Sequence, residues 1–201
     1  MLALSRPSSC PVQINTVANW LMGIAQKYAF PPDVSLFGIA QDGKPVLLHL
    51  RDPRAGAILV TGSRPATTAL LQTIGHSALA LNGKRAGVAV ITSHPEDWEL
   101  GERMGIFSEA APLENIAQFI REAGKGIILL LVEDYELVSR EPDLFKFICE
   151  QGPLRMVWTI CAAEKPADVP VGLFRTRIAE TSAGVFWMRE RSEHIFFSTL
   201  R

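Results

Sequence analysis

Short apolar runs alternate along this chain with segments in which apolar residues recur at helical spacing. The runs cover residues 57–60, 87–91, 126–137 and 154–163, and polar or turn residues follow each of them, as expected of strands buried in a parallel sheet. Between the runs, apolar residues three and four positions apart predict helices, the longest of them after residue 68. The alternation predicts an α/β protein, a three-layer domain with a mainly parallel central sheet.

Two β-hairpins are predicted outside this core pattern. Residues 34–40 and 45–50 flank the dipeptide Asp42-Gly43, and Asp-Gly between apolar runs is a strong hairpin signal because both residues tolerate a positive φ. Residues 184–188 and 194–197 predict a second hairpin, at the edge of the sheet. The mixed, glycine-containing residues 99–112 predict a loop with at most one helical turn.

The first 33 residues are predicted to be an extension, followed by one domain at residues 34–201. Residues 1–11 are rich in proline and serine, and a helix with an apolar stripe follows and ends before Pro31. The stripe consists of Val17, Trp20, Leu21, Ile24 and Tyr28. It needs a covering surface, which is either the domain itself or a partner protein.

Residues 56–80 read as a buried strand, a tight loop and a long helix, which is the geometry of a phosphate-binding P-loop. The motif GxxxxGK[ST] needs glycine amides around phosphate, a lysine for the outer phosphates and a hydroxyl for magnesium. When the motif is aligned on Thr68, Thr67 stands at the lysine position, Ala66 replaces the glycine before it, and Pro65 has no N–H. The candidate nucleotide contacts in this degenerate loop are Gly62, Ser63, Arg64, Thr67 and Thr68. The alternative is a strand, loop and helix that bind nothing.

The apolar run at residues 126–137 carries two adjacent carboxylates, Glu133 and Asp134. In nucleotide hydrolases, such acids follow a central strand beside the P-loop, where the first orders the magnesium shell and the second polarises the attacking water. Glu133 and Asp134 are therefore candidate catalytic residues, and Thr68 and Glu133 would be the metal ligands if magnesium binds. The alternative is a strand end that carries solvated acids.

Two segments resemble one family of ATPases. LFGIAQDGKPVLLHLRDPRAGAILVTG resembles the opening of FtsK/SpoIIIE/HerA-type ATPase domains, in which a hairpin precedes the P-loop strand. VEDYELV is similar to the VDDYDLV of the ATPase domains of type VII secretion motors, a branch of that family. The resemblance implies a P-loop NTPase fold of the RecA/FtsK type, with ATP and magnesium as the cofactors of an active member.

Other positions depart from the family pattern. Residues 162–166 fall where the translocases have ATQRP, and Glu164 takes the place of the glutamine that senses the γ-phosphate. A carboxylate there would repel phosphate. Residues 172–175 are similar to the family's GLI(K/R), but the PTRI motif, whose arginine reaches a neighbouring active site, is not recognised near residues 179–182.

These departures favour a pseudo-ATPase that serves as an interaction or assembly module of a translocation or secretion machine. No cofactor is then expected, and the partner is a protein, such as a catalytic FtsK-like relative. A homohexamer is not expected, because the arginine that acts across subunits is missing. The alternative is an active or weakly active ATP-dependent translocase of DNA or protein that uses Thr68, Glu133 and Asp134 with ATP and magnesium.

Composition narrows the choice of partner and compartment. A formal net charge of −1 gives no support for DNA binding, although it leaves a local basic patch open. The three cysteines lack CxxC spacing, and Cys149 and Cys161 have apolar neighbours, which indicates core positions in a reducing cytoplasm. The four histidines share no metal-ligand spacing, and no apolar run is long enough to insert into a membrane.

Overall fold

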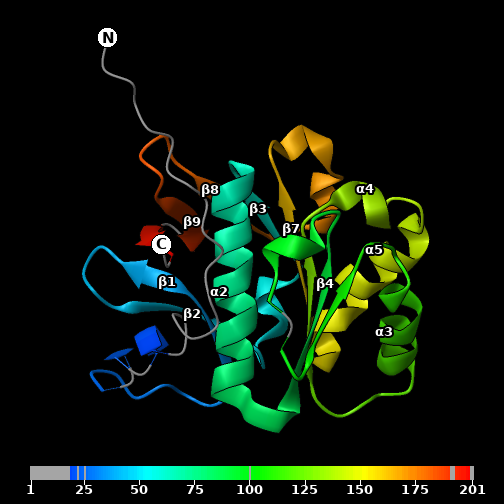
Figure 1. The fold of residues 1–201 in the computed structure, drawn as a ribbon, viewed down its shortest axis with the longest axis horizontal. Helices are drawn as coiled ribbons and strands as arrows, with labels where there is room; N and C mark the ends of the chain where they lie inside the picture. Colours follow the sequence, from blue (N-terminus) through cyan, green and yellow to red (C-terminus); the bar gives the residue numbers. More distant parts are fainter. Residues whose placement is uncertain (1–18, 22, 25, 100, 191–192, 200–201) are drawn as a thin grey trace.

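The computed structural model describes residues 19–21, 23–24, 26–99, 101–190 and 193–199. Within these ranges one ten-stranded sheet carries helices on both faces (Figure 1). The strands are β1 (Val34–Ala40), β2 (Pro45–His49), β3 (Ile58–Thr61), β4 (Ala86–Ile91), β5 (Met104–Phe107), β6 (Ile127–Val132), β7 (Val157–Ala163), β8 (Thr176–Glu180), β9 (Phe186–Glu190) and β10 (Glu193–Ser198). The α-helices are α2 (Arg64–Asn82), α3 (Pro112–Arg121), α4 (Tyr135–Val138) and α5 (Pro142–Gln151). The predicted α/β class and the helix, sheet and helix layers are confirmed.

The strand order is β2-β1-β10-β9-β8-β3-β7-β6-β4-β5. Neighbouring strands from β8 to β5 in this order all run parallel, while β1, β2, β9 and β10 join the sheet through antiparallel pairs. The carboxyl ends of the parallel strands therefore lie along one edge of the sheet, where α/β proteins bind their ligands.

The β1–β2 hairpin is confirmed, whereas the predicted edge position of the second hairpin is wrong. β10 pairs with β1 and β9 pairs with β8, so the β9–β10 hairpin connects the first hairpin to the parallel strands. Phe186 and Phe197 are buried and stack at 5.9 Å between ring centroids, and Phe37 lies 6.1 Å from Phe197. This aromatic contact gives the hairpin a buried face that its short apolar runs did not reveal.

The prediction of a loop at residues 99–112 is also wrong, since these residues contain β5, which pairs parallel with β4. The strand is short and lies at the sheet edge, and only its first residue, Met104, is buried. A four-residue strand with one buried position carries too little periodicity to be read from the sequence.

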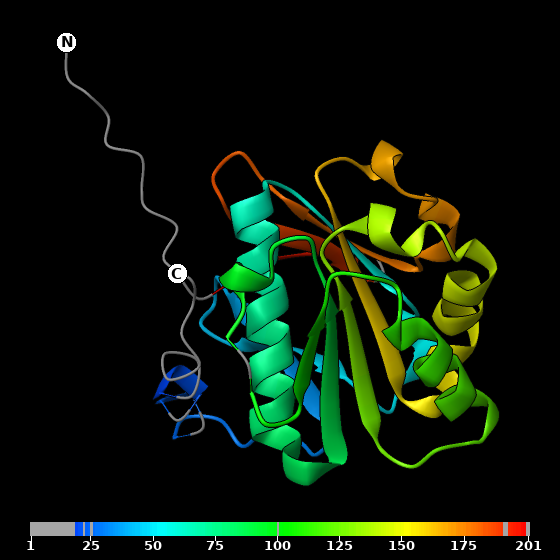
Figure 2. The ribbon, with the colours of Figure 1, turned by 45° about the vertical axis from the view of Figure 1, so that its right-hand side comes forward.

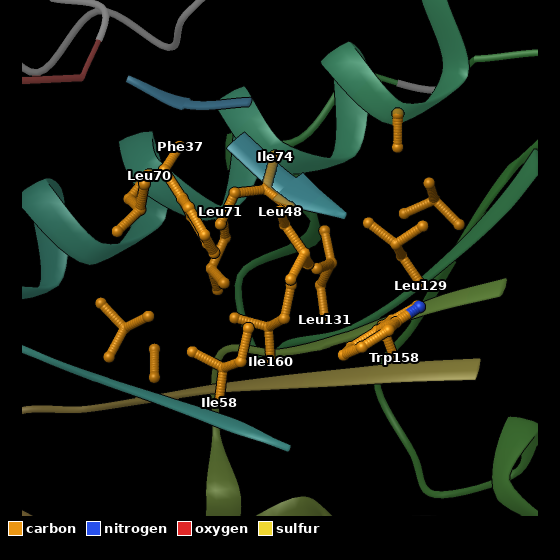
Figure 3. Packing of buried hydrophobic residues seen from close by; sticks show 14 of the residues in the cluster. Phe37, Leu48, Ile58, Leu70, Leu71, Ile74, Leu129, Leu131, Trp158 and Ile160 are labelled. Atoms are coloured by element: carbon orange, nitrogen blue, oxygen red, sulfur yellow. The ribbon is translucent and has the colours of Figure 1, made fainter. Parts of the chain in front are cut away.

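The main core lies between α2 and the sheet (Figures 1 and 2). In Figure 3, Leu70, Leu71 and Ile74 of α2 face Ile58 and Ile160 of the sheet, and all five side chains are fully buried. The neighbouring Trp158 is also buried, and its indole N–H donates to the Leu50 carbonyl at 3.1 Å. Helices α3 and α5 cover the other face with a second apolar cluster.

The apolar stripe before the domain is partly covered by the chain itself. Residues 19–21 and 23–24 are helical, and Leu21 and Ile24 are buried in one cluster with Leu36 of β1. Val17 lies outside the described residues. For Leu21 and Ile24, the structure thus favours the intramolecular alternative.

The two cysteines of the described residues are core positions, as predicted. Cys149 and Cys161 are buried and unbonded to each other, and burial raises the pKa of Cys149 to about 12. Cys10 lies outside the described residues. No helix in the described part of the chain is long and apolar enough to cross a membrane.

Candidate functional site

A cleft of about 490 Å³ opens at the carboxyl ends of β4, β6 and β7, beside the start of α2. The predicted site residues that line it are Arg64, Thr67, Glu133, Asp134 and Glu164. Residues from three separate sequence segments thus meet at the sheet edge where a ligand is expected. The other predicted residues, Gly62, Ser63 and Thr68, lie next to this cleft in the β3–α2 segment.

The turn between β3 and α2 contains only Gly62 and Ser63, because α2 begins at Arg64. When the motif GxxxxGK[ST] is aligned on Thr68 it spans residues 61–68, and residues 64–68 of that span are helical. Ser63 is the residue before the helix and Pro65 lies in the first helical turn, where proline is favoured because its missing N–H has no partner there. Pro65 therefore explains the early start of the helix.

A carboxylate of the protein occupies the donors of this turn. Glu180, the last residue of β8, accepts hydrogen bonds from the Ser63 N–H at 2.8 Å and from the Ser63 hydroxyl at 2.7 Å. The Gly62 N–H donates to the Ala163 carbonyl at 3.2 Å. In a P-loop, amides at the start of the helix point at phosphate, whereas here they bind protein acceptors.

Gly62 allows this close approach of β8. A Cβ atom added at Gly62 would lie 2.6 Å from Cβ of Glu180 and 2.8 Å from its carboxylate, which is closer than real Cβ contacts allow. Sequence reasoning missed Glu180, because its position depends on the parallel pairing of β8 with β3. The local sequence carries no clear signal, because the strand Thr176–Glu180 has only one buried residue, Ile178.

Glu133 is held by donors from α2 and from the segment that follows β4. Its side chain is 1% exposed, and its carboxylate accepts hydrogen bonds from the hydroxyl of Thr68, from the hydroxyl of Thr92 at 2.5 Å and from the indole N–H of Trp98 at 3.2 Å. Nε of Arg64 lies 4.0 Å from the same carboxylate. Sequence reasoning missed Thr92 and Trp98.

The two charged neighbours of Glu133 are also bound by the protein. The Arg64 guanidinium forms an ion pair with Asp97 at 2.5 Å, and Asp97 ends the short helix η3 (Pro95–Asp97) that follows β4. Asp134 accepts hydrogen bonds from the Ser93 N–H at 2.6 Å and from the Ser93 hydroxyl at 2.7 Å. A network of side chains therefore joins the ends of β3, β4, β6 and β8.

This donor set does not fit a magnesium nucleotide in the arrangement described. Magnesium takes oxygen ligands in octahedral geometry, but the predicted ligands Thr68 and Glu133 are hydrogen-bonded to each other. The carboxylates that line the cleft are those of Glu133, Asp134, Glu136, Glu164 and Asp168. Arg64 is the one cation among the described lining residues, so a triphosphate would meet like charge. No group of three or more His, Cys, Asp or Glu in the described ranges could hold a metal ion.

Comparison with known proteins places the fold. No protein-family model matches the chain, and no curated protein sequence matches it. Among solved structures, the cytoplasmic domain of EssC superposes with a TM-score of 0.67 over 90% of this chain, at 12% identity. EccC from Thermomonospora curvata (ATPases 2 and 3), solved in complex with a signal sequence peptide, gives 0.61 over 84% of this chain, at 16% identity. The chain has the fold of these type VII secretion ATPase domains.

The same fold occurs in a conjugation protein. The monomer form of the pCW3 coupling protein TcpA, solved with ATPγS, superposes with a TM-score of 0.63 over 87% of this chain and 68% of its own, at 12% identity. The chain spans 46% of the EssC structure and 40% of the EccC structure. The expected P-loop NTPase fold is therefore confirmed at the level of architecture.

Proposed function

We propose that this chain is an ATPase-like module of a translocation or secretion machine that binds no nucleotide and works by binding a protein partner. The observation that carries the proposal is the carboxylate of Glu180 on the Ser63 N–H and hydroxyl. An anion supplied by the protein holds the position that a phosphate would need, so nucleotide would have to displace it.

The chemistry of the remaining site supports the same function. Without a lysine at residue 67, a nucleotide lacks charge-assisted hydrogen bonds worth about 1.5–3 kcal/mol in binding. Displacing Glu180, and separating Glu133 from Thr68, Thr92 and Trp98, would cost further hydrogen bonds. Glu164 is exposed after β7 and lines the cleft. It stands where the resembling translocases have the glutamine that senses the γ-phosphate, and its carboxylate would repel that phosphate.

The similar structures suggest which kind of partner to expect. EccC is described in complex with a signal sequence peptide, and TcpA with ATPγS. In this chain the hydrogen-bond donors of the β3–α2 turn already bind protein acceptors, which favours binding of a peptide over binding of a nucleotide. The net charge of −1 gives no support for DNA binding. The EssC and EccC structures are described as cytoplasmic domains, and we propose the same location for this chain.

An active or weakly active translocase is the second candidate. Its support is the position of Thr68, Glu133 and Asp134, which lie together at the expected edge of the sheet. Arg64 lies in the cleft and 4.0 Å from Glu133, where a cation could approach a phosphate after the Asp97 ion pair opens.

ATP turnover separates the two candidates. The purified protein should release no phosphate from magnesium-ATP above the rate of the Glu133→Ala variant. Because Glu133 is buried, Asp134→Asn serves as a second control that leaves the hydrogen bonds of Glu133 intact. Magnesium-dependent turnover that both variants abolish would establish an active ATPase site and would favour the second candidate.

A further inference from the structure

A second recess lies at the amino ends of β3 and β8, at the sheet edge opposite the cleft. It consists of two hollows of about 410 and 520 Å³, and Arg54 and Arg175 line both of them. We call this recess the basal groove. Apolar side chains of Phe37, Leu48, Ile58 and Met188 line the first hollow, and Pro53, Pro153, Leu154 and Leu173 line the second.

Arg175 is fixed in place between the two hollows. Its N–H donates to the Ala57 carbonyl at 3.0 Å. A Cβ atom added at Gly56 would lie 2.8 Å from Cβ and 3.4 Å from Cδ of Arg175, so the arginine stem packs directly on this glycine. Gly56 has φ +63°, a conformation that favours glycine. The backbone thus fixes where the arginine side chain begins, and the residue is exposed to solvent.

The basal groove carries positive charge that the described residues do not neutralise. Arg54 forms an ion pair with Asp52 at 2.5 Å, and its hydrogen bonds lower the pKa of Asp52 to about 2. Glu150, the other acid of the groove, lies 4.0 Å from Lys146. No ion pair joins Arg175 or the exposed Arg189 to an acid within the described ranges.

The groove also presents an exposed apolar side chain. Leu154, in the short helix η4 (Gly152–Arg155), is 65% exposed, more than any other large apolar residue of the described chain. A single exposed apolar side chain is common on protein surfaces, but Leu154 borders a recess that two arginines also line. Together with Arg175 and Arg189, it suits a ligand that combines carboxylates with an aliphatic side chain.

We propose that the basal groove binds an acidic segment of a protein partner, with an aliphatic side chain against Leu154 and carboxylates on Arg175 and Arg189. A nucleic acid fits less well, because its affinity needs many phosphate contacts, and of the arginines that line the groove Arg54 is already paired with Asp52. This inference rests on the proposal that the chain binds a protein partner, but not on the state of the nucleotide site.

The test uses the whole chain and a fluorescein-labelled peptide of alternating glutamate and leucine, followed by fluorescence anisotropy. A glutamine–leucine peptide and a labelled single-stranded oligonucleotide are the comparison ligands. The wild-type protein should bind the glutamate peptide best, and added salt should weaken that binding. Arg175→Gln with Arg189→Gln should weaken it about tenfold or more, because each arginine makes charge-assisted contacts.

The matched control is Lys125→Gln with Arg140→Gln, which removes two exposed positive charges away from the groove. Glutamine at residue 175 keeps Cβ, Cγ and Cδ, so the contact with Gly56 persists, and equal urea midpoints for both double variants confirm folding. Leu154→Ser should weaken binding without a change in its salt dependence. The proposal is overturned if both double variants bind alike, if the wild type does not prefer glutamate to glutamine, or if the oligonucleotide binds more tightly. Each of these results would leave the test by ATP turnover unaffected.

Discussion

At the scale of single residues, Glu133 is the side chain that ties the candidate site together. A buried carboxylate is stable only when donors compensate its lost hydration, and Thr68, Thr92 and Trp98 supply them from α2 and from the segment after β4. In this arrangement the acid links elements of the fold. A catalytic acid would instead need its oxygens available to a metal shell or a water.

Replacing Glu133 with glutamine should therefore lower stability. The amide cannot accept from three donors as a carboxylate does, and we expect the free energy of unfolding to fall by about 2 kcal/mol. Urea unfolding followed by tryptophan fluorescence measures this change, and Trp98 lies in direct contact. The control Glu136→Gln, at an exposed position, should change stability by less than about 0.5 kcal/mol. Equal effects of the two variants would contradict the structural role.

The sequence could place only some residues of the site. Thr68, Glu133, Asp134 and Glu164 each follow or adjoin a long apolar run, and parallel strands bring such positions to one edge. Glu180 and Trp98 could not be placed in this way. Their contacts depend on which strand lies beside β3, and on how the chain after β4 returns toward α2.

At the scale of elements, the length of the β3–α2 turn decides what the site can bind. Two residues leave no loop to wrap a phosphate, since α2 begins directly after Ser63. Residue types at the motif positions do not reveal that the helix starts at Arg64. The segment therefore differs from a P-loop in its backbone, which becomes helical at Arg64, as well as in its side chains.

A P-loop graft tests this account of the turn. Replacing residues 61–68 with a full GxxxxGK[ST] sequence and Glu180 with serine removes the early helix start and the competing carboxylate. We expect this variant to bind magnesium-ADP in calorimetry, whereas Thr67→Lys alone should bind none because Glu180 and the short turn persist. A control graft that keeps threonine at residue 67 should bind more weakly than the full graft.

If the full graft folds and still binds no nucleotide, the block lies elsewhere. Glu164 and the Arg64–Asp97 ion pair would then be the next positions to change. Circular dichroism and the urea midpoint establish folding before calorimetry.

A second element-scale feature is the junction between β1 and β10. A Cβ atom added at Gly38 would lie 2.2 Å from the Ser198 carbonyl oxygen, so the two strands approach closely at a position where only glycine fits. Gly38→Ala should lower the free energy of unfolding by about 1–3 kcal/mol. Gly87→Ala in β4 is the matched control, because nothing lies within 4 Å of its added Cβ. Equal urea midpoints for the two variants would contradict the observed strand order.

The elements with long apolar runs were predictable, and the short ones were not. The apolar run that begins at residue 126 contains β6, and helices α3 and α5 lie between the runs, where helical spacing predicts them. β5 and β8 have four and five residues with one buried residue each. These two strands form because they pair with β4, β3 and β9, and the local sequence does not show which strands will be neighbours.

At the scale of the whole molecule, the number of subunits depends on which apolar and charged side chains remain exposed for contact with another subunit. Leu21 and Ile24 pack on the chain's own Leu36, so this part of the N-terminal stripe needs no partner. The boundary predicted between residues 33 and 34 stays a prediction, although this small cluster joins its two sides. Arg177 lies exposed on β8 within the letters Thr-Arg-Ile at residues 176–178, just before the segment compared with PTRI.

We expect the purified protein to be a monomer or small oligomer without nucleotide. Light scattering coupled to size exclusion measures its mass, with and without magnesium-ATP and DNA. A stable hexamer that binds DNA with a steep salt dependence would contradict the docking role. Loss of that hexamer in Arg177→Ala would then identify this arginine as the contact across subunits.

Titration of magnesium-ATP into the purified whole chain in a calorimeter tests most directly whether the protein's own groups occupy the nucleotide site. We expect no saturable heat with or without magnesium, and no rise in the thermal midpoint at high ATP, because a ligand that binds the folded state raises that midpoint. Saturable, magnesium-dependent binding to the wild-type protein would contradict this expectation.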